Sequence, residues 1–233
     1  MMKRLRALGF VLVVLGIAFL AGAGIAYSKV QDGYDSLQAF SEVQNVQLSY
    51  NEDGQLVDRG ETAGAEAIMS LLTDDWKYPV VESDFDPADP LVNTASEYMY
   101  QMATITFHVL HGTETVVLDA DVTTESGEVF KAGEYEFEVD GRYWTAFDRE
   151  NPIEAIAREQ AWSGTAHGLI GELGVGTVTA STLQLGLAFA GTLGGIGLTI
   201  ALAGLGMVWV ARGKFEQQIV VPLHAREPVG AEH

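Results

Sequence analysis

The chain has 233 residues, which accommodates one domain of ordinary size or a smaller domain with appended segments. It contains 13 Lys and Arg residues against 32 Asp and Glu residues, and the formal net charge of −19 argues against a nucleic-acid-binding protein, which needs a basic face. Cysteine is absent, which excludes disulfides, thiolate metal sites and a cysteine nucleophile.

Two uncharged segments enclose the acidic part of the chain. Residues 7–26 are rich in Leu, Val, Ile, Gly and Ala, and they follow three basic residues, Lys3, Arg4 and Arg6. Residues 173–211 are also uncharged, and Arg212 and Lys214 follow them. About 20 apolar helical residues span the roughly 30 Å hydrocarbon core of a bilayer. We therefore predict that 1–27 is an N-terminal transmembrane helix and that 185–211 is a second, Gly-rich one.

The basic flanks predict how the chain is oriented. Basic residues next to membrane spans favour the cytoplasmic side. We expect a two-pass protein of the cell membrane, with both termini in the cytoplasm, a short cytoplasmic tail at 212–233 and an extracytoplasmic domain at 28–164. Cleavage of the first segment as a signal peptide is the alternative, although its twenty uncharged residues exceed the usual length of a signal-peptide core.

The domain between the spans is acidic and of mixed structure. Residues 28–163 carry seven basic and 28 acidic residues, a net charge of −21. Helical spacing of apolar residues predicts helices at 62–73 and 94–111, the second opened by a capping box at Thr94 and Glu97. Asn151 and Pro152 predict the start of a third helix that ends near Trp162.

Strand-like runs lie mostly between the last two of these helices. They are residues 115–118, 129–130, 135–139 and 143–147, with turns at Ser126-Gly127 and Asp140-Gly141; an earlier hairpin joins 46–50 to 56–57, and a Pro-containing loop covers 77–91. The predicted fold class is an α+β extracytoplasmic domain with a small antiparallel β meander, held between two transmembrane α-helices.

The second uncharged segment is too long for one simple crossing. Its 39 residues would extend about 58 Å as a helix, nearly twice the bilayer core. We therefore expect 165–184 to be an interfacial or projecting helical segment ahead of the crossing at 185–211. A third crossing is the alternative, but it would place Arg212 and Lys214 outside the cell.

Small residues at four-residue spacing predict close helix packing inside the membrane. Such residues let helix backbones approach one another, within one chain or between subunits. The candidates are Gly191, Gly195, Gly194 and Gly197 in the second span and Ala18, Gly22 and Ala26 in the first. The expected partners are the lipid bilayer and other membrane subunits, or a second copy of the chain.

Two weaker candidate metal sites lie in the acidic domain. His108, His111 and Glu114 have the composition of a two-His-one-carboxylate site, but their spacing does not place them on one helix face. Asp84, Asp86 and Asp89 offer oxygen ligands for calcium, without the spacing or the mid-loop glycine of an EF-hand. No cofactor is predicted, and no nucleophile elbow, phosphate-binding glycine loop or HExxH motif occurs.

The segment Phe147-Asp-Arg-Glu-Asn-Pro152, followed by a short helix and a Gly/Ala-rich crossing, resembles uncharacterised two-pass membrane proteins of actinobacterial type. The resemblance implies an N-terminal crossing and an outward-facing domain, and no functional residue is carried over from it. We expect a non-enzymatic accessory or scaffolding subunit of a larger membrane complex. The alternative is an extracytoplasmic module that senses a ligand or a cation.

Overall fold

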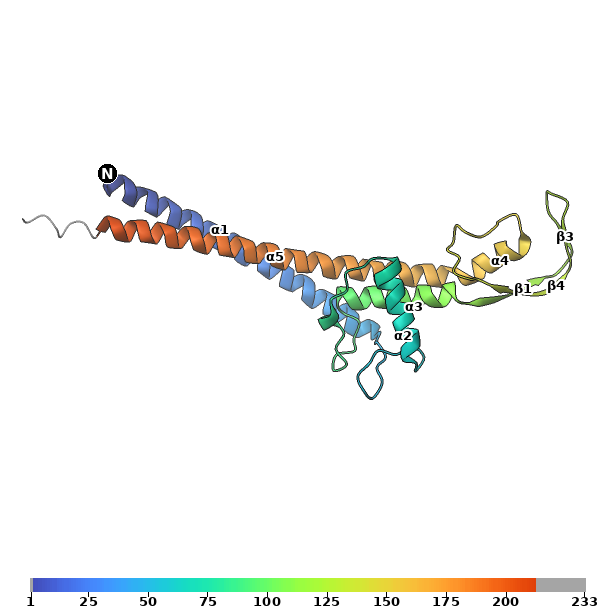
Figure 1. Cartoon of the computed structure of the whole chain (residues 1–233). Helices are drawn as coiled ribbons and strands as arrows, with labels where there is room; N and C mark the ends of the chain where they lie inside the picture. The colour runs from blue at the N-terminus through green and yellow to red at the C-terminus, as the bar shows by residue number, and fades with distance from the viewer. Residues whose placement is uncertain (1, 213–233) are drawn as a thin grey trace, which may run out of the picture. The chain divides into compact units, whose positions relative to one another are not determined.

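The computed structural model describes residues 2–212 and contains two long helices, three shorter ones and four short strands. The long helices are α1 (Met2–Gln44) and α5 (Gly164–Arg212), and the others are α2 (Thr62–Ser70), α3 (Ala95–Leu110) and α4 (Pro152–Ala161) (Figure 1). Contacts divide the described chain into two compact units. Unit 1 contains residues 2–30 and 186–212, and unit 2 contains residues 31–185.

Unit 1 is an antiparallel pair formed by the N-terminal part of α1 and the C-terminal part of α5. On α1, the residues that face the partner recur every seven positions: Gly9, Gly16, Ala23 and Val30, all buried. Gly9 lies against Gly204, and Gly16 lies against Gly197. A methyl group on Gly16 would lie 2.6 Å from the backbone nitrogen of Ala201, because backbone atoms occupy the space that a side chain would need. We call this contact the glycine seam.

Both long helices are long and apolar enough to cross a membrane. Neither is confined to its uncharged segment. α1 continues to Gln44, and α5 is helical from Gly164, so the segment 165–184 is helical, as expected, and is continuous with 185–211. At about 1.5 Å per residue, α1 and α5 extend roughly 64 and 74 Å, about twice the thickness of a hydrocarbon core.

In unit 2, α3 packs against α2 and supplies much of the core. The predicted capping box at its start is confirmed, because Thr94 Oγ1 accepts from Glu97 N and Glu97 Oε2 accepts from Thr94 N. Burial raises the pKa of Glu97, which is almost fully enclosed. After α2 a π-helical turn, η1 (Leu71–Asp75), adds Leu72 to the core, and the predicted cap of α4 is confirmed at Asn151.

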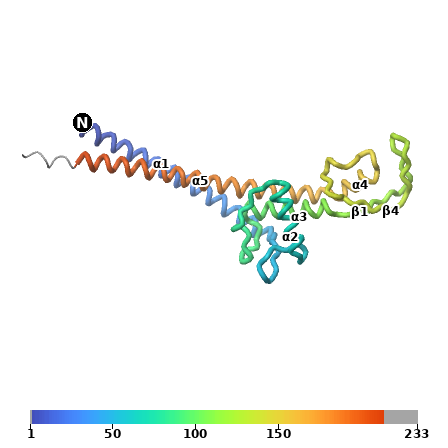
Figure 2. The backbone as a smooth tube through the Cα atoms, in the orientation of Figure 1, coloured from blue at the N-terminus to red at the C-terminus, as the bar shows by residue number. Residues whose placement is uncertain are grey.

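The strands form antiparallel pairs, but the predicted meander is wrong. β1 (Thr113–Leu118) pairs with β4 (Gly133–Glu138), and β2 (Val122–Thr123) pairs with β3 (Val129–Phe130) inside the connection between them (Figure 2). Asp121 holds the junction by accepting from Lys131 Nζ and Ala132 N. The inner hairpin turns at Gly127, as predicted, and it is so short that β1 pairs with β4, the predicted run 135–139, instead of with the run 129–130.

The predicted strand at 143–147 is also wrong. Each aromatic residue of this segment packs on a different neighbour. Tyr143 stacks on Trp162, which follows α4, Trp144 lies under the guanidinium of Arg158 at 3.9 Å, and Phe147 packs on Phe137 of β4. The predicted hairpin after residue 46 is present only as isolated bridges, including Tyr50 with Leu56. The loop 77–91 contains one short 3₁₀ turn, η2 (Glu82–Asp84).

Candidate functional site

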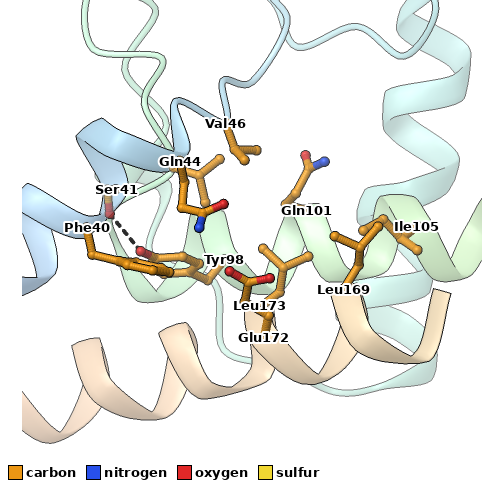
Figure 3. Close-up of a pocket in the computed structure, with 11 residues that line it drawn as sticks. Phe40, Ser41, Gln44, Val46, Tyr98, Gln101, Ile105, Leu169, Glu172 and Leu173 are labelled. Carbon is orange, nitrogen blue, oxygen red and sulfur yellow. Dashed lines mark hydrogen bonds between the residues drawn. The ribbon is translucent and has the colours of Figure 1, made fainter. Parts of the chain in front are cut away.

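The candidate site is a cavity of about 260 Å³ in unit 2, enclosed by the C-terminal part of α1, the N-terminal part of α5 and α3. Figure 3 shows its lining residues. Most are apolar, and the remainder are polar groups with no basic residue among them. The lining comprises Phe40, Ser41, Gln44, Val46, Val92, Tyr98, Gln101, Ile105, Leu169, Glu172 and Leu173.

A buried hydrogen bond fixes one wall of the cavity. The hydroxyl groups of Ser41 and Tyr98 lie 2.7 Å apart, and the Ser41 hydroxyl also donates to the Leu37 carbonyl. On the other side of the Tyr98 ring, α5 presents Gly176, where a methyl group would lie 2.6 Å from ring carbons. This close approach holds α1, α3 and α5 together, because a glycine on α5 leaves room for the tyrosine ring.

Glu172 is the only charged side chain that lines the cavity. It is exposed, and within residues 2–212 its carboxylate has no hydrogen-bond or ion-pair partner. The surrounding apolar surface, with Gln44 and Gln101 as neutral neighbours, leaves the negative charge available to a cation from outside.

A second hollow of about 560 Å³ adjoins the first along α1 and α5. The two share Phe40 and Glu172, and the second continues along α1 to Gly33 and along α5 to Thr179. Together they form a groove between the two helices, which we call the α1/α5 groove. Its walls are mainly apolar, so a long thin apolar ligand fits it better than a compact polar one.

A neighbouring face of α5 in unit 2, which shares Val175 with the groove, is exposed and has a regular pattern. Its residues alternate at spacings of four and three, the spacing of a seam between paired helices. They are Gly164, Gly168, Gly171, Val175, Val178, Thr182 and Leu185, all exposed. No atom lies within 4 Å of where a methyl group on Gly168 or Gly171 would stand. We call this surface the open face of α5.

The three predicted two-His-one-carboxylate ligands do not converge. His108 Nε2 lies 2.9 Å from Asp58 Oδ2, and Arg59 Nη2 lies 3.3 Å from His108 Nδ1. His111 Nδ1 faces the carbonyl of Phe107, while Glu114 is in β1. Burial raises the pKa of Glu114. No group of three potential metal ligands comes together in the part of the chain that the structure describes.

The candidate calcium ligands lie in the loop before α3 and form local turns. Asp86 Oδ1 accepts from Ala88 N, and Asp89 Oδ2 accepts from Asn93 Nδ2 at 3.4 Å. Asp84 lies in the 3₁₀ turn. Within residues 2–212 these oxygens do not gather around one common point.

The candidate packing residues divide between the seam and other faces. Gly197 lies in the seam against Gly16, and Gly194 approaches Ala23. Added methyl groups on Gly191, Gly195 and Gly22 would meet no atom within 4 Å, while Ala18 is exposed and Ala26 is half-buried. The contacts in unit 1 follow the seven-residue spacing on α1, whereas the prediction used a four-residue spacing.

Sequence reasoning missed the α1/α5 groove and the open face of α5. One signal for the groove was available, since Glu172 is the last charged residue before the 39 uncharged positions that end at Ala211. Phe40 and Tyr98 carried no such signal, because their approach depends on the fold. Comparison with known proteins finds no matching family model, no matching curated protein and no matching solved structure.

Proposed function

We propose that this chain is a non-enzymatic, two-pass integral membrane protein that serves as an accessory or scaffolding subunit of a larger membrane complex. In this proposal both termini are cytoplasmic and the acidic domain is extracytoplasmic. The antiparallel seam supports that orientation, because it brings the basic residues near the start of α1 and the end of α5 to the same end of the helix pair.

The open face of α5 carries the proposal of a partner. Val175, Val178 and Leu185 expose 66, 66 and 71% of their surfaces. At the level of Leu183, the adjacent α1 residue is Gly33, which acidic residues flank at positions 32 and 35. Charged residues at that level favour an aqueous setting, so lipid does not account for the exposed apolar side chains beside them.

The glycines of the open face strengthen this argument. A glycine in a helix interior costs about 1 kcal/mol relative to alanine. At Gly176 the ring of Tyr98 occupies the space that the missing side chain leaves. Gly168 and Gly171 have no such neighbour in the described chain. A second helix packed on this face would explain both the small residues and their spacing.

The experiment is a purification of the full-length tagged protein from its native membrane in mild detergent, with stoichiometry measured by mass spectrometry. Gly171→Leu is the test variant, because the open space around Gly171 lets the isolated chain fold normally. Gly191→Leu is the matched control, since Gly191 is also unobstructed but lies on roughly the opposite side of α5.

We expect a protein partner at a fixed ratio with the wild type and with Gly191→Leu, and at least a tenfold lower yield of that partner with Gly171→Leu. A wild-type protein that purifies alone would contradict the proposal. A partner retained equally by both variants would contradict the assignment of the interface to the open face.

The second candidate function is an extracytoplasmic ligand- or cation-binding sensor module. The observation that favours it is the α1/α5 groove, whose unpaired Glu172 carboxylate lies against apolar walls within the described chain. Its cation form, in which the acidic domain binds calcium, is tested by calorimetry of the full-length protein in detergent. Absence of calcium binding there would remove it.

A further inference from the structure

We infer that the α1/α5 groove binds a single-chain amphiphile with a protonated amine head group. This inference goes beyond the accessory role and gives the ligand-binding alternative a chemical class. The groove and the open face of α5 share Val175, but the residues that carry this inference, Phe40, Tyr98 and Glu172, do not belong to that face.

The size of the groove favours a ligand with a single alkyl chain. The inner cavity of about 260 Å³ lies at the small end of ligand sites and suits one alkyl chain better than two. Its apolar walls come from three helices: Phe40 on α1, Ile105 on α3 and Leu173 on α5. The adjoining hollow lengthens the site, along α1 to Gly33 and along α5 to Thr179.

The charge of the groove selects the head group. Glu172 belongs to both hollows and, among residues 2–212, is the only charged residue in either lining. A protonated amine gives this carboxylate the charge-assisted hydrogen bond that it lacks within residues 2–212. The amide of Gln44 lies on the side of Glu172 and offers a further hydrogen-bond acceptor, whereas the amide of Gln101 points away from Glu172 (Figure 3). A carboxylate or phosphate head group would be repelled by Glu172 and by the acidic domain around it.

The continuity of the helices indicates the source of the ligand. The same α1 and α5 that form the groove continue into the two segments that are apolar enough to cross a membrane. A membrane-borne amphiphile therefore needs no separate carrier to reach the protein. Its tail would occupy the apolar walls, and its amine would face Glu172.

The test uses the full-length protein in phosphatidylcholine nanodiscs and a dodecylamine that carries a diazirine on its alkyl chain. Photolysis followed by peptide mass spectrometry locates the labelled residues. We expect labelling to concentrate in segments 40–46, 101–105 and 169–179, and unlabelled dodecylamine, but not dodecanoate, to compete with it.

Two matched variants test the role of the carboxylate. Glu172→Gln removes the charge from the groove, whereas Glu42→Gln removes a likewise exposed charge from α1 that does not line either hollow. For an exposed ion pair we expect competition by dodecylamine to weaken about fivefold in Glu172→Gln and to stay unchanged in Glu42→Gln.

Three results would overturn the inference. They are labelling spread evenly over the apolar segments of α1 and α5, equal competition by dodecylamine and dodecanoate, and equal behaviour of the two variants. None of them bears on the partner test of the open face, which measures copurification and uses no lipid probe.

Discussion

The glycine seam predicts a large difference between substitutions that look alike in the sequence. In Gly16→Ala the added methyl group would stand 2.6 Å from Ala201 N and 2.7 Å from the Gly197 carbonyl oxygen. Ordinary contact begins near 3.4 Å, so the helices must separate by about 0.8 Å. A gap of that size forfeits a quarter to a half of the local dispersion energy, and overpacking of this kind costs about 1–3 kcal/mol.

The matched control is Gly191→Ala, where the added methyl group meets nothing within 4 Å. Alanine is a better helix former than glycine by about 1 kcal/mol, which offsets part of the cost at Gly16 and stabilises the control. Because this helix-propensity gain is common to both variants, the overpacking alone separates them, and we expect a difference of about 2 kcal/mol in the free energy of unfolding.

The assay is reversible unfolding in mixed micelles with an increasing fraction of sodium dodecyl sulfate. Because the chain contains no cysteine, Arg6→Cys and Arg212→Cys introduce one unique dye pair near the same end of the helix pair, and energy transfer between the dyes reports its opening. Equal midpoints for Gly16→Ala and Gly191→Ala would refute the close approach of α1 and α5.

Three further predictions concern unit 2 and are measured by chemical unfolding of the full-length protein, followed by tryptophan fluorescence. Thr94→Ala removes the hydroxyl that caps α3 and should destabilise the protein by about 1 kcal/mol, whereas Thr94→Ser should retain most of the stability. Burial raises the pKa of Glu97 above its unfolded value of 4.5, so this group makes stability increase as the pH falls through the raised pKa; Glu97→Gln should flatten that increase, and an unchanged pH profile would contradict the burial effect. Gly176→Ala should cost about 1–3 kcal/mol because its methyl group meets the Tyr98 ring at 2.6 Å, whereas Gly171→Ala should be neutral or stabilising.

Local signals in the sequence predicted the local features of the fold. The capping residues Thr94 and Asn151 act within three positions of themselves, so both helix starts could be recognised without knowledge of the tertiary structure. The 165–184 helix could be predicted for the same kind of reason, since no Pro interrupts the segment.

Features that depend on distant residues could not be predicted in this way. The pairing of the four strands depends on how tightly the chain turns near Asp121. The short inner hairpin makes β1 pair with β4. The packing of Trp144 depends on Arg158, fourteen positions away on a helix. The aromatic residues at 143–147 therefore predicted a strand, although this segment forms none and its side chains pack on separate neighbours.

The candidate site also depends on residues that are distant in the sequence, so it could not be predicted. Residues near positions 40, 98 and 172 meet only because α1, α3 and α5 approach one another. The glycines that permit the approach, Gly33 and Gly176, are indistinguishable in the sequence from Gly168 and Gly171, which contact nothing within the described chain. The metal candidates were proposed from composition, and the fold uses His108 with Asp58 instead.

Photo-crosslinking in the native membrane is the direct test of the proposal that the open face of α5 binds another membrane subunit. A photoreactive amino acid at Val178 probes the face, and the same residue at Val129 in β3 is an exposed apolar control outside it. We expect one protein adduct of constant mass from Val178 and none of that mass from Val129. Adducts from Val178 that contain only lipid, or the same adducts from both positions, would contradict it.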